Sequence, residues 1–273
     1  MAKTSAIVVG TGGIARYHLS VMLSMSNTRI TGLVEVADEQ RQLTRDLFDS
    51  KGKNCPPFYN TIKALIAAQG AADTAFINTP HKFHLENARD CLRADMDVLL
   101  EKPMVINASE AKRLIKIRDE SRKLLVVAFP GSLSPAVKKA KKMIAGGKLG
   151  NVTSVSAYAH QNWKEMTVGQ WRQDPVISGG GFLFDTGSHM LNTVVDLIDQ
   201  DVVEVCALMD NCGTRVDINS TVSGRFRDGT ALSLAAAGDS MHCSSEITVI
   251  GDQGILRTGI WGERLLFKPL REN

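Results

Sequence analysis

The stretch Ala6-Ile7-Val8-Val9-Gly10-Thr11-Gly12-Gly13-Ile14-Ala15 decides the fold, because a short apolar run leads there into a glycine-rich loop. The run predicts a strand, and the residues after the loop have helical period. Gly10 permits a tight turn, Gly12 lets a ligand approach the backbone, and Ala15 lets the helix pack closely on the sheet. N–H groups at the start of such a helix bind phosphate. The stretch therefore predicts a Rossmann unit that holds a dinucleotide on Gly10, Thr11, Gly12, Gly13 and Ile14.

An acidic residue, Glu35, ends the second predicted strand. It lies about 20 residues after Ala15, where dinucleotide-binding units carry the acidic residue that binds the ribose. A carboxylate there can accept hydrogen bonds from the ribose hydroxyls and repels a 2′-phosphate. The sequence therefore favours NAD over NADP. Asp38 is the alternative acidic residue, but its position fits the N-cap of the next helix. Arg41 is near enough in sequence to bind a phosphate, so NADP stays open as the cofactor.

Residues 1–128 alternate between β-branched runs and segments of helical period, which predicts a parallel sheet with helical crossovers. The predicted strands are Ala6–Val9, Ile30–Glu35, Thr74–Asn78, Val98–Leu100 and Leu124–Ala128. The predicted helices are Ile14–Ser24, Glu39–Phe48, His84–Ala94 and Ala108–Ser121. The last helix carries a capping box, with Asn107 as N-cap and Glu110 three residues later.

The pattern changes over residues 129–273, where strand-like runs dominate. The predicted strands are Val152–Ala159, Val202–Leu208, Thr221–Phe226, Ala231–Ala235, Glu246–Ile250 and Ile255–Arg257. Two helices accompany them, Pro135–Ala145 and roughly Gly187–Ile198. This half predicts an α/β domain on a mostly antiparallel, open sheet with helices on one face. The whole chain is thus predicted to be an α/β protein of two domains, 1–128 and 129–273.

The overall composition excludes several classes of protein. The net charge of +3 is too small to indicate a nucleic-acid or anionic membrane surface, and the lysine cluster at 138–142 fits a solvated helix face. No apolar run is long enough to span a bilayer, and the first apolar run is too short for a signal peptide. Five scattered cysteines without a Cys-x-x-Cys pair favour a reducing cytosol over disulfides or structural zinc. No His/Asp/Glu spacing indicates a metal site.

Three further motifs bear on chemistry. Asn78-Thr79-Pro80-His81-Lys82-Phe83-His84 and Glu101-Lys102-Pro103 each follow a predicted parallel strand. Ligands of open parallel sheets bind beyond the carboxyl ends of the strands, where both motifs lie with the glycine loop. The third motif, Gly179-Gly180-Gly181-Phe182-Leu183-Phe184-Asp185-Thr186-Gly187-Ser188-His189, opens the helix of the second domain.

With these motifs in this order, the sequence from about residue 5 to residue 260 resembles the Gfo/Idh/MocA oxidoreductases, the glucose–fructose oxidoreductase and inositol dehydrogenase family. The resemblance implies a Rossmann domain followed by an α/β domain with an open sheet. It implies NAD(P)-dependent oxidation or reduction of a hydroxyl or keto group on a sugar, cyclitol or similar polyol. It also implies that Lys102, Asp185 and His189 are catalytic, and that Thr79, Pro80 and Glu101 border the nicotinamide and its ribose.

The chemistry of these side chains agrees with such a reaction. Oxidising a secondary alcohol needs a base for the hydroxyl proton, and His189 suits that role because imidazole titrates near neutral pH. Lys102 can hold the developing alkoxide, or take the proton itself if burial lowers its pKa. Asp185 is one helical turn before His189 and can bind a substrate hydroxyl. Which of Lys102 and His189 is the base stays open.

Other residues are candidates with structural alternatives. His84 lies beside the cofactor loops on a predicted helix, where it either borders the cofactor or has a structural role. His160, at a strand end, and Trp171-Arg172, before the glycine run, are candidate substrate contacts. Taken singly, Asp185 and His189 also fit structural roles, at a helix start and at a domain interface respectively.

The sequence departs from the family in three places. The chain is shorter than the usual length of more than 300 residues. Phe129-Pro130-Gly131-Ser132-Leu133 stands where relatives often carry an arginine, and Asn192 stands where they commonly have aspartate.

Three functions follow from the sequence. The first is a polyol dehydrogenase or reductase. The second is a related enzyme that retains NAD and cleaves or epimerises a glycoside, and the third is a non-catalytic cofactor-binding regulator. The uncovered sheet face of the second domain predicts a homodimer or homotetramer. A small polyol is the expected partner, with neither nucleic acid nor membrane.

Overall fold

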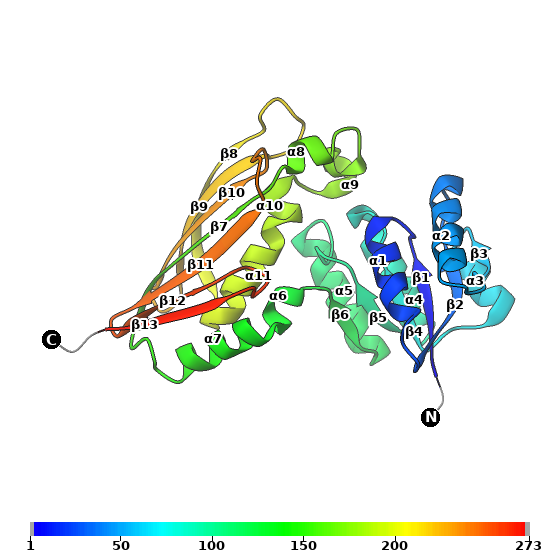
Figure 1. The fold of residues 1–273 in the computed structure, drawn as a ribbon, viewed down its shortest axis with the longest axis horizontal. Helices are drawn as coiled ribbons and strands as arrows, with labels where there is room; N and C mark the ends of the chain where they lie inside the picture. Colours follow the sequence, from blue (N-terminus) through cyan, green and yellow to red (C-terminus); the bar gives the residue numbers. More distant parts are fainter. Residues whose placement is uncertain (1–2, 271–273) are drawn as a thin grey trace. The chain divides into compact units, whose positions relative to one another are not determined.

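The computed structural model describes residues 3–270, and they fall into two compact units, Met1–Ala128 and Phe129–Asn273. Each unit has its own sheet and its own hydrophobic core (Figure 1). No helix among the described residues is long and apolar enough to cross a membrane.

The first unit is a six-stranded parallel sheet in the order β3-β2-β1-β4-β5-β6. Its strands are β1 (Thr4–Val9), β2 (Thr28–Val34), β3 (Phe58–Tyr59), β4 (Thr74–Ile77), β5 (Asp97–Leu100) and β6 (Leu125–Val127). Its helices are α1 (Gly13–Met22), α2 (Asp38–Ser50), α3 (Ile62–Gln69), the 3-10 turn η1 (His81–Phe83), α4 (His84–Arg93) and α5 (Ala108–Ser121). The predicted Rossmann fold is confirmed.

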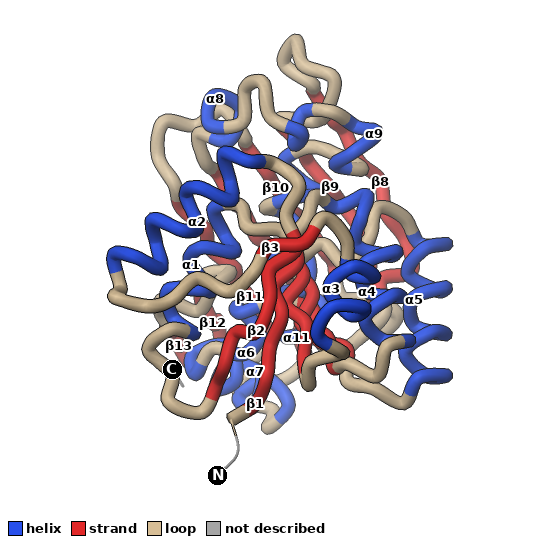
Figure 2. The backbone as a smooth tube through the Cα atoms, turned by 90° about the vertical axis from the view of Figure 1, so that its right-hand side faces the viewer, coloured by secondary structure: helices blue, strands red, loops and turns tan. Residues whose placement is uncertain are grey.

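Helices cover both faces of this sheet, with α1 and α2 on one side and α3, α4 and α5 on the other (Figure 2). Two apolar clusters match the two faces, because alternate side chains of each strand point to opposite sides. Ala6 and Val8 of β1 pack with Leu19 of α1 in one cluster, while Ile7 and Val9 belong to the other. The sheet is therefore buried on both faces, as its near-continuous apolar strands predict.

Short elements of this unit are missing from the predicted set. The two-residue strand β3 and the helix α3 lie between the second and third predicted strands. Thr61 caps α3 by accepting a hydrogen bond from Ala64 N at 3.1 Å. By contrast, α5 has the predicted bounds, and its Asn107 cap accepts from Glu110 N at 2.9 Å.

The second unit is a seven-stranded mixed sheet in the order β13-β12-β11-β7-β10-β9-β8. Its strands are β7 (Val152–His160), β8 (Val202–Asp210), β9 (Asn219–Phe226), β10 (Ala231–Ala237), β11 (Ser244–Gly251), β12 (Gly254–Thr258) and β13 (Leu265–Pro269). Neighbours pair antiparallel except β7 and β10, which are parallel. This agrees with the predicted mostly antiparallel sheet and adds β13, which the prediction lacks.

Helices of the second unit lie on one face of its sheet, and the other face is bare (Figure 1). They are α6 (Pro130–Leu133), α7 (Pro135–Ala145), α8 (Trp163–Met166), the 3-10 turn η2 (Trp171–Gln173), α9 (Pro175–Ser178), α10 (Phe182–Asp185) and α11 (Gly187–Ile198). The lysine-rich helix α7 is not wholly a solvated surface, because Lys141 Nζ lies 2.7 Å from Asp196 Oδ1 on α11.

Candidate functional site

The glycine loop of the first unit joins β1 to α1 at the carboxyl edge of the parallel sheet. Gly10 has φ of +80°, and a Cβ there would lie 3.0 Å from the backbone of Asn78 and Thr79. Any other residue would be strained in this conformation and would press on the β4 loop. Gly10 therefore brings the loops after β1 and β4 side by side, an arrangement that Asn78 N also supports by donating to Val9 O at 2.8 Å.

Gly12 and Gly13 form the part of the loop that fits a pyrophosphate. A Cβ built at either residue meets nothing within 4 Å, so the backbone faces open space. Gly12 is the N-cap of α1 and supplies no side-chain cap, and Ile14 beside it is exposed. The first N–H groups of α1 are thus left to a ligand, and phosphate is the group such a helix start binds. The residues present fit a dinucleotide.

Glu35 follows β2 and joins the loop after β2 to the glycine loop. Its Oε2 accepts from Thr11 N at 2.8 Å and from Thr11 Oγ1 at 3.2 Å. Its Oε1 accepts from Val36 N at 2.8 Å and from Ala37 N at 2.9 Å. Both carboxylate oxygens are therefore engaged by the protein itself, which the sequence did not predict.

Asp38 is not the N-cap of α2, so that prediction is wrong. Ala37 is the N-cap without a side-chain bond, and Asp38 is the first helical residue. The helix begins one residue earlier than predicted because Arg41 N donates to the carbonyl oxygen of Ala37 at 3.1 Å. The Asp38 side chain is 96% exposed and lies 3.6 Å from Arg41 Nη1.

Arg41 of α2 contacts the loop that follows β2. Its Nε donates to the carbonyl oxygen of Glu35 at 2.8 Å, and its Nη2 contacts that oxygen and Asn60 Oδ1. The guanidinium carbon is 5.8 Å from the centre of the Phe58 ring. Arg41 is therefore held by the backbone that carries Glu35, close to where an adenosine ribose would meet that carboxylate.

His84 joins the loops after β4 and β5. The residue is fully buried, with Nε2 at 2.8 Å from Thr79 O and Nδ1 at 2.9 Å from Pro103 O. Burial lowers the pKa of this imidazole, and it outweighs the hydrogen bonds to carbonyl oxygens, which favour the charged form. Asn87 Nδ2 also donates to Thr79 Oγ1 at 3.0 Å. His84 thus holds the Thr79-Pro80 and Lys102-Pro103 segments together through both ring nitrogens.

Glu101 and Lys102 follow β5 at the same edge, and the Lys102–Pro103 peptide bond is cis. Glu101 Oε1 lies 2.9 Å from His18 Nε2 on α1. Burial acts to raise the pKa of Glu101, but the hydrogen bond and charge of His18 and the charge of Lys102 outweigh it, so the net shift is downward. Glu101 is therefore an anion that links the glycine-loop helix to the lysine-bearing loop.

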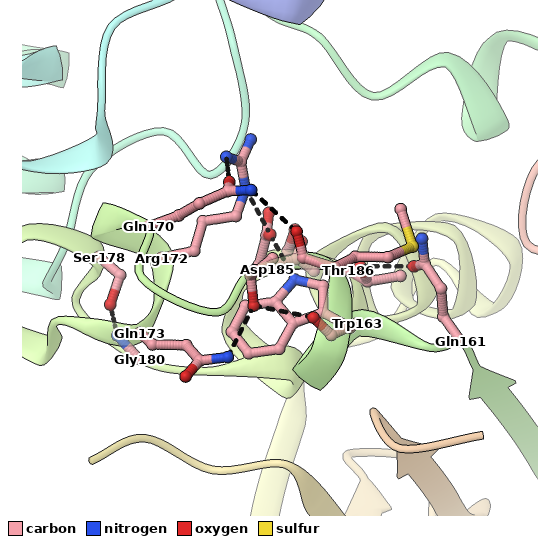
Figure 3. Close-up of polar contacts among 12 residues, drawn as sticks. Gln161, Trp163, Gln170, Arg172, Gln173, Ser178, Gly180, Asp185 and Thr186 are labelled. Carbon is pink, nitrogen blue, oxygen red and sulfur yellow. Dashed lines mark hydrogen bonds and ion pairs between the residues drawn. The ribbon is translucent and has the colours of Figure 1, made fainter. Parts of the chain in front are cut away.

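Asp185 ends the short helix α10 of the second unit and is only 6% exposed. Its Oδ2 accepts from Trp163 Nε1 at 2.8 Å and lies 3.3 Å from Arg172 Nε (Figure 3). The Arg172 guanidinium also stacks on the Trp171 ring, with its carbon 4.5 Å from the ring centre. The predicted substrate contact Arg172 and the predicted catalytic Asp185 are thus brought together.

His189 lies in the first turn of α11, directly after the α10 segment. Its ring meets those of Phe129 and Trp261 edge-on, with centres 5.8 Å and 5.9 Å apart. The backbone N–H of His189 donates to Thr186 O at 3.1 Å. Two aromatic rings therefore pack against the imidazole of His189.

His160 ends β7 and has different neighbours. Its Nδ1 lies 2.7 Å from His242 O and 3.0 Å from Ser240 Oγ, and its ring stacks on Tyr158. The next residue, Gln161, contacts Thr186 Oγ1 through Oε1 at 3.3 Å (Figure 3). The segment after β7 therefore reaches the Asp185–His189 stretch through Gln161.

The two segments whose sequence departs from the family pattern, 129–133 and Asn192, contact each other in the structure. Asn192 Nδ2 donates to Ser132 Oγ at 3.2 Å and so ties α11 to α6. A Cβ at Gly131 would lie 2.1 Å from Ile260 O, so only glycine allows α6 to pack there. The two segments that depart from the family pattern therefore contact each other directly.

Sequence reasoning missed Trp163, Phe129 and Trp261 as neighbours of the catalytic candidates. Trp163 reaches Asp185 across 22 residues of sequence, and no local pattern signals such a contact. Over residues 3–270 the structure contains no group of three or more His, Cys, Asp or Glu side chains placed to hold a metal ion. The arrangement offers an anion and an imidazole in the second unit, and a lysine beside a dinucleotide-fitting loop in the first.

Comparison with known proteins identifies both units. A model described as the oxidoreductase family, NAD-binding Rossmann fold, matches residues 4–129. A model described as the GFO/IDH/MocA C-terminal domain matches residues 137–257.

Two named relatives are sugar dehydrogenases. A D-xylose 1-dehydrogenase [NADP(+)] of Haloarcula marismortui is 30% identical over 200 residues, which is 70% of this chain and 54% of that protein. A glucose-6-phosphate 3-dehydrogenase of Bacillus subtilis is 26% identical over 263 residues, 89% of this chain and 71% of that protein. The chain thus spans about half the length of the first of these relatives.

Solved structures agree on the fold. The WlbA dehydrogenase from Bordetella pertussis, in complex with NADH and UDP-GlcNAcA, superposes with a TM-score of 0.87 at 21% identity, covering 100% of this chain and 79% of that one. An inositol dehydrogenase homologue from Azotobacter vinelandii, complexed with NAD+, gives a TM-score of 0.87 at 19% identity, covering 100% and 75%.

Proposed function

The chain belongs to the Gfo/Idh/MocA family of oxidoreductases, and from that membership we propose that it transfers hydride between a nicotinamide dinucleotide and a hydroxyl or keto carbon of a sugar, cyclitol or similar polyol. The names of its relatives support this substrate class, since they include xylose, glucose-6-phosphate and scyllo-inositol dehydrogenases.

The first unit holds the cofactor in this proposal. The loop Gly10, Thr11, Gly12, Gly13 and Ile14 takes the pyrophosphate, with open backbone at Gly12 and Gly13, and Glu35 faces the adenosine ribose. The nicotinamide, when bound, supplies the hydride acceptor or donor. Thr79, Pro80, Glu101 and Lys102 border the nicotinamide and its ribose, and His84 binds the cofactor's side of the site by holding the loops after β4 and β5 together. NAD is the proposed cofactor because the carboxylate of Glu35 repels a 2′-phosphate.

The catalytic groups in this proposal are Lys102, Asp185 and His189. His189 or Lys102 takes the hydroxyl proton as hydride leaves the carbon. Lys102 also stabilises the developing alkoxide by its positive charge. Asp185 binds a substrate hydroxyl, and the indole N–H of Trp163 with the guanidinium of Arg172 hold its carboxylate in place. Trp171, Arg172 and His160 border the substrate.

The observation that carries the proposal is the buried carboxylate of Asp185, held by Trp163 and Arg172 directly before His189 in a chain that also has the dinucleotide-fitting glycine loop. Burying a carboxylate costs free energy that its partners must offset, and buried ionisable groups with specific partners in a candidate site support a functional role.

The test is a panel of sugars and cyclitols with NAD, followed by NADH absorbance, on the wild type and Lys102→Ala. We expect turnover on at least one compound and a loss of about 10²-fold or more in kcat for Lys102→Ala. Lys116→Ala, an exposed lysine on α5, is the matched control and should keep wild-type turnover.

Two outcomes would contradict the proposal. Undiminished hydride transfer in Lys102→Ala would remove the proposed role of Lys102. Silence across the whole panel, with NAD binding seen by calorimetry, would instead favour an enzyme that retains its NAD or a cofactor-binding regulator.

Two properties of the whole protein belong to the same proposal. We propose that the bare face of the second sheet pairs with another copy to form a homodimer or homotetramer, because an uncovered sheet face is typical of an interface. All five cysteines are free thiols, which supports a cytoplasmic location.

A further inference from the structure

We propose that Asp217 is a positioning residue for Asp185, and this inference rests on the proposed function. Asp217 lies in the connection between β8 and β9, distant in sequence from every candidate site residue, and is only 8% exposed. No motif in the sequence singles it out.

Asp217 binds three successive N–H groups at the start of α10. Its Oδ1 accepts from Gly181 N at 2.7 Å, and its Oδ2 accepts from Leu183 N at 2.9 Å. Its carbonyl oxygen accepts from Phe182 N at 2.9 Å. One residue therefore satisfies the donors that the first turn of a helix leaves without intrahelical partners.

Gly181 lies so close to the backbone of Asp217 that no side chain fits at position 181. A Cβ at Gly181 would lie 1.9 Å from the carbonyl oxygen of Asp217 and 2.7 Å from its nitrogen. The glycine at this position of the Gly179-Gly180-Gly181 run is thus required by backbone contact with Asp217.

We call the three hydrogen bonds from residues 181–183 to Asp217 the clamp. The residues that it holds begin the short helix that ends at Asp185. Helix α10 has four residues, too few to be stable without tertiary contacts. Asp185 N donates to Gly181 O at 2.9 Å, and Thr186 N donates to Phe182 O at 3.0 Å. The backbone of Asp185 is therefore fixed one turn from the residues that Asp217 holds.

The carboxylate of Asp185 is fixed independently by Trp163 and Arg172. The Trp163 ring packs beside Phe182, with centres 6.1 Å apart, and Phe182 is fully buried. Asp217 thus fixes the start of α10. Phe182, the buried first residue of α10, packs against Trp163, whose indole N–H donates to Asp185. Loss of the clamp should displace Asp185 without removing any group that reacts.

The decisive variant is Asp217→Asn, which keeps the side-chain shape but turns one of the two acceptors into a donor that faces an N–H group. Asp252→Asn is the matched control, because Asp252 likewise accepts a backbone N–H, from Asn151 at 3.0 Å, in a turn of the same unit. Asp217→Ser is the second variant, for use if the Asn variant does not fold.

Two readouts separate positioning from general stability. Hydrogen exchange of the peptide amides at 181–183 should be about tenfold faster in Asp217→Asn, with α7 and the first unit unchanged. On the substrate found by the panel, kcat should fall by about 10²-fold, while the dissociation constant of NADH stays within about twofold of wild type. Asp252→Asn should match wild type in both.

Unchanged exchange at 181–183 would overturn the inference without any substrate. Faster exchange with undiminished kcat would overturn it as well, since the clamp would then serve folding alone. Asp185→Asn separates this from the proposed function: full turnover in that variant would contradict the proposed function, whereas an inactive Asp185→Asn beside a fully active Asp217→Asn would contradict only the role of Asp217.

Discussion

At the end of β2, the carboxylate of Glu35 holds two loops together through four hydrogen bonds from Thr11, Val36 and Ala37. A carboxylate has about four lone-pair sites, so its capacity is filled by the protein itself. Ribose hydroxyls must therefore share these oxygens or displace one donor. The residue has two roles in our proposal, which are to order the cofactor loop and to disfavour a 2′-phosphate.

Glu35→Gln is expected to weaken NAD binding by about tenfold, roughly 1.4 kcal/mol, because the amide replaces one acceptor oxygen with a donor. The ratio of NAD to NADP affinity should fall as well, since the repelling charge is gone. Isothermal titration calorimetry measures both. Asp38→Asn, at the exposed first residue of α2, should stay within about twofold of wild type for NAD. A wild-type preference for NADP would refute the role of Glu35.

At the scale of elements, the first unit is ordered by contacts between loops at one edge of the sheet. His84, the first residue of α4, joins the loop after β4 to the loop after β5, and His18 of α1 joins Glu101. These contacts connect helices α1 and α4 to the loops after β4 and β5, so the positions of the helices and of the loops depend on each other. Burial of His84 makes that coupling dependent on pH.

We expect the free energy of unfolding to fall as the pH drops from 7.5 to 5.5, partly through His84. Burial holds the folded-state pKa of His84 below the ordinary value of histidine, about 6.5, so the unfolded chain binds a proton first and acid favours unfolding. The contribution is present above pH 6.5 and is lost below it, at up to about 1.4 kcal/mol per pH unit. Glu101, whose pKa lies below the ordinary value of glutamate, contributes only in stronger acid.

Urea unfolding followed by circular dichroism at several pH values measures this slope. His84→Gln should flatten it between pH 7.5 and 5.5, whereas His242→Gln, at an exposed residue, should leave it as in wild type. An equal slope in His84→Gln and wild type would show that His84 does not carry the effect.

At the scale of the whole molecule, the two units differ in how their sheets are covered. The parallel sheet has helices on both faces, whereas the mixed sheet has them on one (Figures 1 and 2). Alternate residues of β10 are buried and exposed, with Ser233 and Ala235 on the bare side. Large apolar side chains are also exposed on the edge strand β8, among them Val205 and Leu208.

Sedimentation of the wild type is expected to show a dimer or tetramer whose dissociation depends on concentration. Ala235→Glu places a charge in the middle of the bare face and should shift the population to monomer. Ala64→Glu, at an exposed position of α3, is the control and should sediment as wild type. A wild type that is monomeric at all concentrations would contradict the proposed assembly.

Much of the fold can be predicted from the sequence, because secondary structure depends on local sequence pattern. Helices α5, α7 and α11 have the predicted bounds, and the strands lie within a few residues of theirs. Periodicity reports which face of an element is buried, and glycine at a strand–helix junction reports a turn. Elements of two to eight residues, such as β3 and α3, carry too little periodicity to be found in this way.

The sequence by itself determined the Rossmann unit, its glycine loop, and the candidates Lys102, Asp185 and His189. Only the tertiary structure decided what holds them: Trp163 and Arg172 on Asp185, the filled carboxylate of Glu35, and the clamp of Asp217 across 36 residues to Gly181. The physical reason is that regular structure follows from near neighbours in the chain, whereas a buried polar group takes its partners from whichever distant segments packing brings beside it.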